Sequence, residues 1–273
     1  MPYIRFFLLA VWYTLGATVI CGLGVFLCRT LFVRMLGGGA GRGVLLATSI
    51  IGTPVHEMGH ALTCLLFGHA ITDMSLWQPS APDGNLGYVT HTYNRRNPYH
   101  ILGNLFIGIG PIFSGLGVLT LALWLCFPSA LADYFDAASS MVAAGDGGVL
   151  LFLEGLKLFP HAIGEAITSD DVAVWLRIIG VIVILSVALH IELSPADIKG
   201  SLGAIPLYLA LVLVLTVVCA LLGDGAMTTV LDGLALFSAA LTSLFVIVLV
   251  ISLLELLIAL PIWLLRTLFG KRR

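Results

Sequence analysis

The chain has 273 residues, of which 59% are hydrophobic and only 10% are charged, and its mean hydropathy is +1.08. A soluble domain of this size needs far more charge to cover its surface, so these values exclude a soluble globular protein. The net charge is -2, and no cluster of basic and aromatic residues indicates a nucleic-acid partner. The sequence therefore predicts an all-α polytopic membrane protein that lies in a lipid bilayer.

Long apolar runs predict about six transmembrane helices, because a helix needs about 20 residues to cross a hydrocarbon core. The runs cover about residues 6–28, 43–67, 101–127, 172–193, 203–223 and 234–266. The first run is longer than the apolar core of about 7–15 residues in a signal peptide, so we expect a retained helix. Pro261 is expected to kink or end the last helix. We treat residues 1–273 as a single integral membrane domain.

The segment from His69 to Tyr99 has a different pattern. Asp73 to Leu76 alternates polar and apolar residues, and residues 86–93 are rich in strand-forming types. Between them, Pro82-Asp83-Gly84-Asn85 is a strong turn signal. These features predict a small membrane-associated β-hairpin. Farther along, residues 128–171 are acidic, and Val149–Phe159 is expected to form a short interfacial helix.

The basic residues predict the orientation of the chain, since cytoplasmic loops carry more lysine and arginine. With six spans, both termini, the hairpin and Lys199 share one side, which we expect to be the cytoplasmic side of a bacterial cell membrane. That side then holds eight basic residues, and the other side holds four: Arg29, Arg34, Arg42 and Lys157.

The motif His56-Glu57-Met58-Gly59-His60 fits the pattern H-E-x-x-H. On a helix the two histidines are four residues apart and share a face, so both imidazoles can bind one zinc ion (Zn2+). Glu57 can take a proton from a water at that metal. Such polar groups in an apolar span are costly unless they are paired or metal-bound, which favours a functional site over a structural His–Glu cluster.

A catalytic zinc site needs a third protein ligand. Leu66 stands where a third histidine would follow in the extended motif, so the ligand must come from farther along the chain. The nearby candidates are His190, Glu192 and Asp197. We favour Asp197 because Pro195 breaks the helix before it and the expected topology puts it at the depth of the histidines. His190 and Glu192 remain alternatives, and a surface pair of Asp197 with Lys199 is the non-functional reading.

Three short motifs resemble the site-2 protease family of intramembrane zinc metalloproteases. The first is the H-E-x-x-H motif within a span. The second is Gly108 to Ser114, which resembles the family's Gly-Pro-x-x-Asn element with Ser114 in place of Asn. The third is Ser194-Pro195-Ala196-Asp197, which resembles the late element that supplies an aspartate ligand. Gly87-Tyr88-Val89 is also similar to part of the family's membrane-dipping hairpin. The resemblance covers residues 43–200, with residues 1–42 and 201–273 as additional spans.

The resemblance implies a zinc metalloendopeptidase that cleaves membrane-protein or peptide substrates near the cytoplasmic face. Glu57 would be the general base, and Asn104 or Ser114 could contact the substrate or a developing oxyanion. The alternatives are a non-catalytic zinc-binding scaffold and a metal or small-solute transporter. The cysteines are expected to be small buried hydrophobic residues without a functional role. We expect four histidines to be solvated: His69, His91, His100 and His161. Glu255 has no assigned role.

Overall fold

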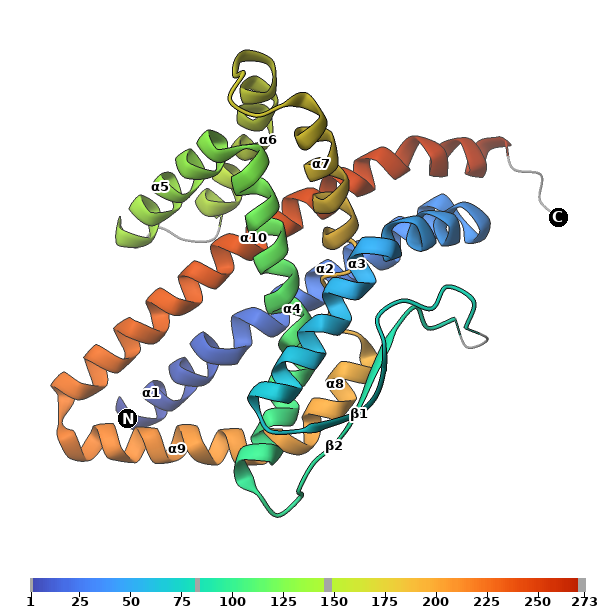
Figure 1. Ribbon diagram of the computed structural model, residues 1–273. Coiled ribbons are helices and arrows are strands. Elements are labelled where there is room, and N and C mark those ends of the chain that lie inside the picture. Colours follow the sequence, from blue (N-terminus) through green and yellow to red (C-terminus); the bar gives the residue numbers. More distant parts are fainter. Residues whose placement is uncertain (1, 82–83, 145–148, 270–273) are drawn as a thin grey trace.

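The computed structural model describes residues 2–81, 84–144 and 149–269, and it is mostly helical with one small sheet (Figure 1). This confirms the helical fold class and the hairpin predicted from sequence. The helices are α1 (Pro2–Val11), α2 (Ala17–Leu36), α3 (Gly38–Leu66), α4 (Pro98–Cys126), α5 (Pro128–Ala144), α6 (Val149–Thr168), α7 (Val174–Ala188), α8 (Pro195–Ser201), α9 (Ile205–Leu222) and α10 (Asp224–Phe269). A π-helical turn (Trp12–Gly16) joins α1 to α2, and a 3-10 turn (Leu202–Ala204) joins α8 to α9.

The hairpin consists of two antiparallel strands, β1 (Ala70–Ser75) and β2 (Tyr88–Thr92). Ile71 pairs with His91 and Ser75 pairs with Tyr88, with an irregularity in the register between Ile71 and Asp73. The Tyr88 hydroxyl donates a hydrogen bond of 2.7 Å to Asp73 Oδ2 across the two strands. Of the expected turn residues, 82 and 83 lie outside the described part of the chain.

Four helical segments among the described residues are long and apolar enough to cross a membrane. They are Tyr3–Leu36, Pro98–Cys126, Pro195–Leu222 and Asp224–Leu268. The predicted count of six spans is therefore not confirmed. The fourth predicted span corresponds to α7, which has only 15 residues. The second predicted span lies in α3, whose 29 residues are long enough but include several polar side chains. The last predicted span, about 234–266, lies within α10, which extends beyond it at both ends, and Pro261 does not end this helix.

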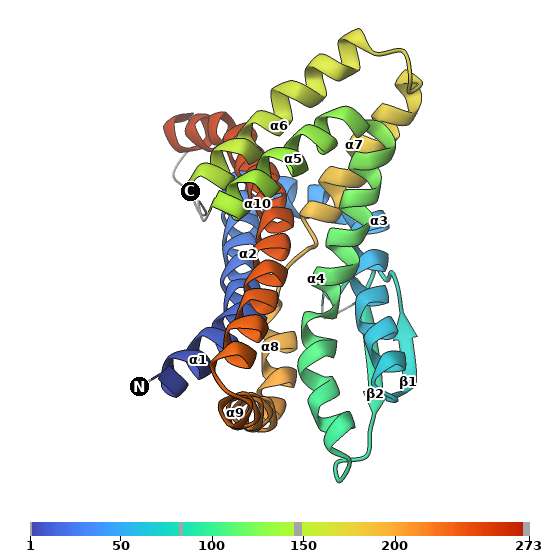
Figure 2. The ribbon, with the colours of Figure 1, turned by 90° about the vertical axis from the view of Figure 1, so that its left-hand side faces the viewer.

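The helix α9 lies across the other helices instead of running along them (Figures 1 and 2). It contacts α1, α4 and α10 at one end of the bundle, while α5 and α6 lie at the other end (Figure 2).

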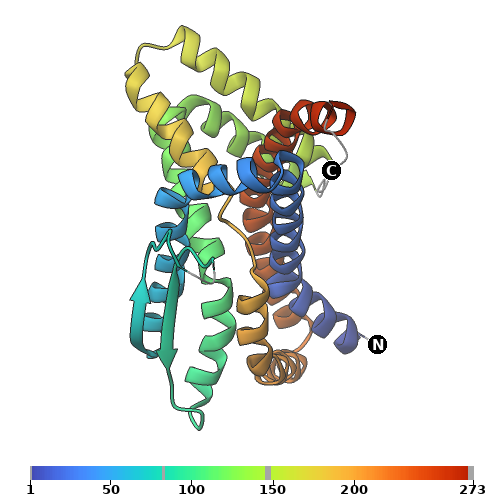
Figure 3. The same cartoon turned by 90° about the vertical axis from the view of Figure 1, so that its right-hand side faces the viewer.

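The C-terminal end of α10 lies beside the C-terminal end of α2, where Arg266 donates a hydrogen bond of 3.0 Å to the Met35 carbonyl. Since α1 begins at the opposite end (Figure 3), the structure does not support the expectation that both termini share one side.

The helices α3 and α4 pack closely against each other. A Cβ atom on Gly59 of α3 would lie 2.6 Å from the backbone of Pro111 in α4. A Cβ atom on Gly110 would lie equally close to the Gly59 carbonyl oxygen. Small residues thus let the two backbones approach, as is common between membrane helices. On the other side of α4, the fully buried Ile112 and Leu119 belong to the main apolar core.

Adding one methyl group at this contact should destabilise the protein. We expect Gly59→Ala to lower the free energy of unfolding by about 1–3 kcal/mol, the usual cost of overpacking a core. The same change at Gly43, in the same helix, meets no atom within 4 Å and should leave stability unchanged or raise it through better helix propensity. Thermal unfolding of both variants in detergent measures the difference. Equal melting temperatures would contradict the close packing.

The position of the end of α10 can be tested by cysteine labelling on a cysteine-free background. Ser139 in α5, Lys199 in α8 and Thr267 near the end of α10 are all exposed. A membrane-impermeant reagent should label cysteines at 139 and 267 from the same side of sealed vesicles, and a cysteine at 199 from the other side. Labelling of cysteines at 199 and 267 from the same side would contradict this arrangement and favour the topology expected from sequence, with both termini on one side.

Candidate metal centre

The helix α3 carries His56, Glu57 and His60 in the middle of the molecule. The two histidines are one helical turn apart, and their ring centroids are 5.0 Å apart in an edge-to-face arrangement. This is the geometry expected when two side chains four residues apart point from one face of a helix. Both Nε2 atoms face the carboxylate of Asp197, which comes from the short helix α8.

Each imidazole is held by a hydrogen bond from its other nitrogen to a backbone carbonyl. His60 Nδ1 lies 2.8 Å from the carbonyl oxygen of Ile107, and His56 Nδ1 lies 3.0 Å from that of His190. The Ile107 carbonyl is free to accept because Pro111, four residues later in α4, has no N–H to donate. With Nδ1–H donating, the lone pair of each ring is on Nε2. Metal-binding histidines are typically oriented in this way.

Asp197 is positioned by the start of its own helix. Ser194 caps α8: its hydroxyl accepts from the Asp197 N–H at 3.2 Å, and Asp197 Oδ2 accepts from the Ser194 N–H at 3.1 Å. Gly108 of α4 lets this helix approach, because a Cβ there would collide with the Ser201 hydroxyl. The carboxylate then reaches the histidines. Asp197 Oδ1 is 3.1 Å from His60 Nε2, and Oδ2 is 3.8 Å from His56 Nε2.

The two alternative ligands have other partners. His190 Nδ1 lies 2.8 Å from the Ser186 carbonyl, one turn earlier. Buried Glu192 forms an ion pair with the partly buried Arg29 of α2. Among the described residues, His56, His60 and Asp197 form a group that could hold a metal, and neither His190 nor Glu192 belongs to such a group.

The three side chains suit a zinc ion. Two imidazole nitrogens and one carboxylate oxygen at about 2.0–2.2 Å from zinc make a three-ligand site with a fourth position left for water or substrate. Tetrahedral bonds of that length separate neighbouring ligand atoms by about 3.3–3.5 Å. His60 Nε2 lies 3.1 Å from Oδ1 and His56 Nε2 lies 3.8 Å from Oδ2 of Asp197, and one ligand atom from each of the three residues lies within 4.8 Å of the others. The donor set therefore fits the metal that the sequence motif implies.

The candidate centre opens into a cavity of about 630 Å³. Glu57, which is 7% exposed, lines this cavity beside the two histidines. Gly87, in the segment that leads into β2, lies directly against Glu57, since a Cβ on this glycine would be 2.7 Å from Glu57 Cγ. Asn104 also lines the cavity. Ser114 does not: its hydroxyl donates to the Val55 carbonyl at 2.8 Å and ties α4 to α3.

Sequence reasoning missed two features of this region. Arg29 was assigned to a loop on the outer side, whereas it lies in α2 and lines the cavity with its partner Glu192. A charged residue near the end of an apolar run was the signal that could have indicated an intramembrane pair. His69 was expected to be solvated, but it is only 3% exposed. His161 is exposed as expected, and His91 and His100 are half-buried.

Removal of any of the three donors should empty the centre. We expect His56→Ala, His60→Ala and Asp197→Ala each to lose one equivalent of zinc relative to the unchanged protein, because two remaining ligands bind zinc weakly. His161→Ala and Asp133→Ala are matched controls, since these side chains form an exposed pair at 3.5 Å outside the cavity. Metal analysis of the purified proteins measures the content. Full zinc content in Asp197→Ala, together with loss in His190→Ala, would move the third ligand to His190.

No family model, curated protein or solved structure matches this chain. The resemblance to site-2 proteases therefore depends on the short motifs alone.

Proposed function

We propose that the chain is an intramembrane zinc metalloprotease of the site-2 protease type. One observation carries the proposal: Nε2 of His56, Nε2 of His60 and the carboxylate of Asp197 converge within one cavity, and Glu57 lines that cavity next to them. Three protein donors and an adjacent carboxylate are the requirements for metal-assisted hydrolysis. A purely structural zinc site has no use for the carboxylate of Glu57.

The chemistry divides between the metal and the protein. When bound, zinc supplies a Lewis acid that polarises a carbonyl oxygen and increases the acidity of water. Glu57 accepts a proton from the attacking water and then delivers it to the amine nitrogen of the leaving peptide. The Ile107 and His190 carbonyls hold the two imidazoles in a fixed orientation throughout, and the side-chain amide of Asn104 is available to donate to the substrate.

The hairpin supports a peptide as the substrate. The part of the hairpin that lines the cavity is residues 84–89 and His91, which include most of β2. Among the residues that the structure describes, β2 pairs with β1 alone, so its outer edge has no partner strand there. An extended peptide can add to such an edge through main-chain hydrogen bonds. Because helical segments hide their carbonyls, a substrate helix would have to unwind first, and the edge beside Glu57 would hold the unwound segment.

The apolar helices support a membrane location. Four described segments are long and apolar enough to cross a bilayer, and many large apolar side chains on α7, α9 and α10 are exposed. Such surfaces are costly in water but not in lipid. Natural substrates would then be membrane proteins with weak helices near the cytoplasmic face, to which the sequence assigns Lys199 and the hairpin.

Cleavage of a tagged single-span protein in proteoliposomes tests the proposal. We expect Glu57→Gln to keep its zinc and to lose cleavage by about 100-fold or more, the usual contribution of a general base. Glu154→Gln is the matched control, because that glutamate pairs with Lys157 on α6, away from the cavity. Cleavage at the original rate by Glu57→Gln would contradict the assigned role.

The same preparation distinguishes the alternatives. A scaffold would bind zinc without cleaving any of a panel of single-span substrates with helix-weakening Gly or Pro residues. A transporter would carry zinc or a small solute into the liposomes, and Glu57→Gln need not abolish that flux. Either outcome would overturn the protease proposal while leaving the metal centre in place.

A further inference from the structure

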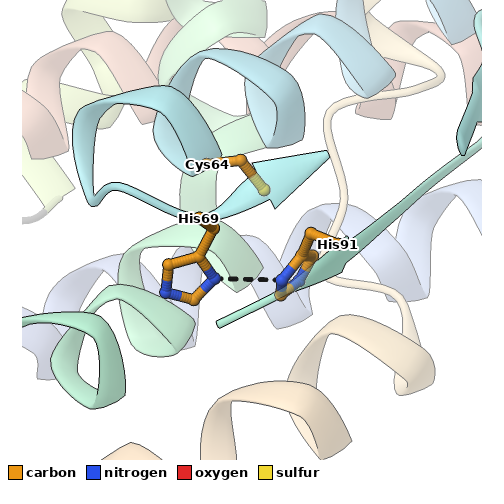
Figure 4. Close-up of side chains that lie close together, drawn as sticks. All are labelled: Cys64, His69 and His91. Carbon is orange, nitrogen blue, oxygen red and sulfur yellow. Dashed lines mark hydrogen bonds between the residues drawn. The ribbon is translucent and has the colours of Figure 1, made fainter. Parts of the chain in front are cut away.

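A second group of potential metal donors lies at the base of the hairpin, outside the centre described above. It consists of Cys64 at the end of α3, His69 just before β1 and His91 in β2 (Figure 4). The three donor atoms lie within 4.8 Å of one another. Cys64 is fully buried and His69 nearly so, whereas His91 is half-buried.

The end of α3 brings His69 back over Cys64. Gly68 adopts a φ of +68°, which favours glycine, and the chain reverses there. The Gly68 N–H donates to the Leu65 carbonyl at 3.2 Å, and the His69 N–H donates to the Cys64 carbonyl at 2.8 Å. These two bonds form a Schellman motif, which fixes how the chain leaves the helix. His69 and Cys64 are therefore held together by the local backbone.

The strand register adds the third donor. His91 pairs with Ile71, two residues after His69, so the hairpin places the two imidazoles side by side. His69 Nδ1 and His91 Nδ1 are 3.0 Å apart (Figure 4). Two zinc-bound nitrogens in a tetrahedral site are separated by about 3.3 Å, so the observed spacing is close to that of two ligands of one ion.

A hydrogen bond sets the direction of the His69 lone pair. His69 Nε2 lies 2.8 Å from the His100 carbonyl, an acceptor, so Nε2 carries the proton. The lone pair on Nδ1 then points toward His91. Burial lowers the pKa of His69 and of His91 below the ordinary histidine value. Tyr93 stacks on His69 at 4.8 Å between ring centroids and further fixes the ring.

We propose that Cys64, His69 and His91 bind a second zinc ion that fastens the hairpin to α3. Two nitrogens and one thiolate are a donor set that zinc prefers, and the thiol of Cys64 loses its proton on binding. Cys64 is one helical turn beyond His60, about 6 Å along the helix axis, so the ion is separate from the first centre. This site holds the strand that borders the cavity, and its existence does not depend on protease activity.

Cobalt tests the site selectively, because the first centre has no sulfur ligand. In the full-length Asp197→Ala variant, in which the first centre is weakened, cobalt titration should produce a near-ultraviolet thiolate-to-cobalt charge-transfer band that zinc removes by competition. Cys64→Ser in this background should abolish the band. Cys219→Ser should keep it, since Cys219 is a buried free cysteine of α9. No band, or a band that survives Cys64→Ser, would overturn the proposal.

A second measurement covers the case in which Cys64→Ser fails to fold. His91→Ala changes a half-buried strand residue and should weaken zinc affinity by more than about 100-fold, because even outer-shell partners of a metal contribute 10–100-fold. In the Asp197→Ala background, zinc should raise the melting temperature, since a ligand of the folded state stabilises it. Adding His91→Ala should remove that rise, and adding His161→Ala should not. A rise that persists with His91→Ala would contradict the site.

Discussion

The orientation of the candidate metal centre depends on two backbone carbonyls, those of Ile107 and His190. The Ile107 carbonyl lacks its usual partner because Pro111 has no N–H, and the His190 carbonyl lies just beyond the end of α7. Both accept a hydrogen bond from an imidazole of α3. A buried polar group without a partner is costly, so each carbonyl and each Nδ1–H satisfies the other. The proline of α4 and the break after α7 therefore define where the two Nε2 atoms point.

The centre was predictable to the extent that local patterns determine it. Helical spacing is enough to place His56 beside His60, and the helix break expected at Pro195 favoured Asp197 as their partner. The capped helix α8 that presents Asp197 was not predicted. The hairpin was also predictable from alternation and turn residues. The burial of His69 was not predictable from local patterns. It arises from contacts with His100 and Tyr93, which the folded hairpin brings next to it.

The path of the later helices was less predictable for a different reason. Hydropathy reports whether a segment avoids water, not its direction, so α9 has the composition of a span while it lies across the bundle. Hydropathy also does not report which side chains of α2 face the cavity. Arg29 of α2 pairs with Glu192 and lines the cavity, so this helix contributes to the cavity beside the candidate metal centre. Removing Arg29 would leave the buried carboxylate of Glu192 without this partner.

The length of α10 has a consequence for how the protein sits in its bilayer. Its 46 residues form a rod of about 69 Å at 1.5 Å per residue, more than twice the thickness of a hydrocarbon core of about 30 Å. Tilt alone absorbs only part of this excess. At least one end of the rod must therefore stand in the headgroup layer or in water. Near its middle, where the Tyr134 hydroxyl of α5 donates to the Ser243 carbonyl and Gly155 of α6 lies against Val246, α10 is covered by protein in place of lipid.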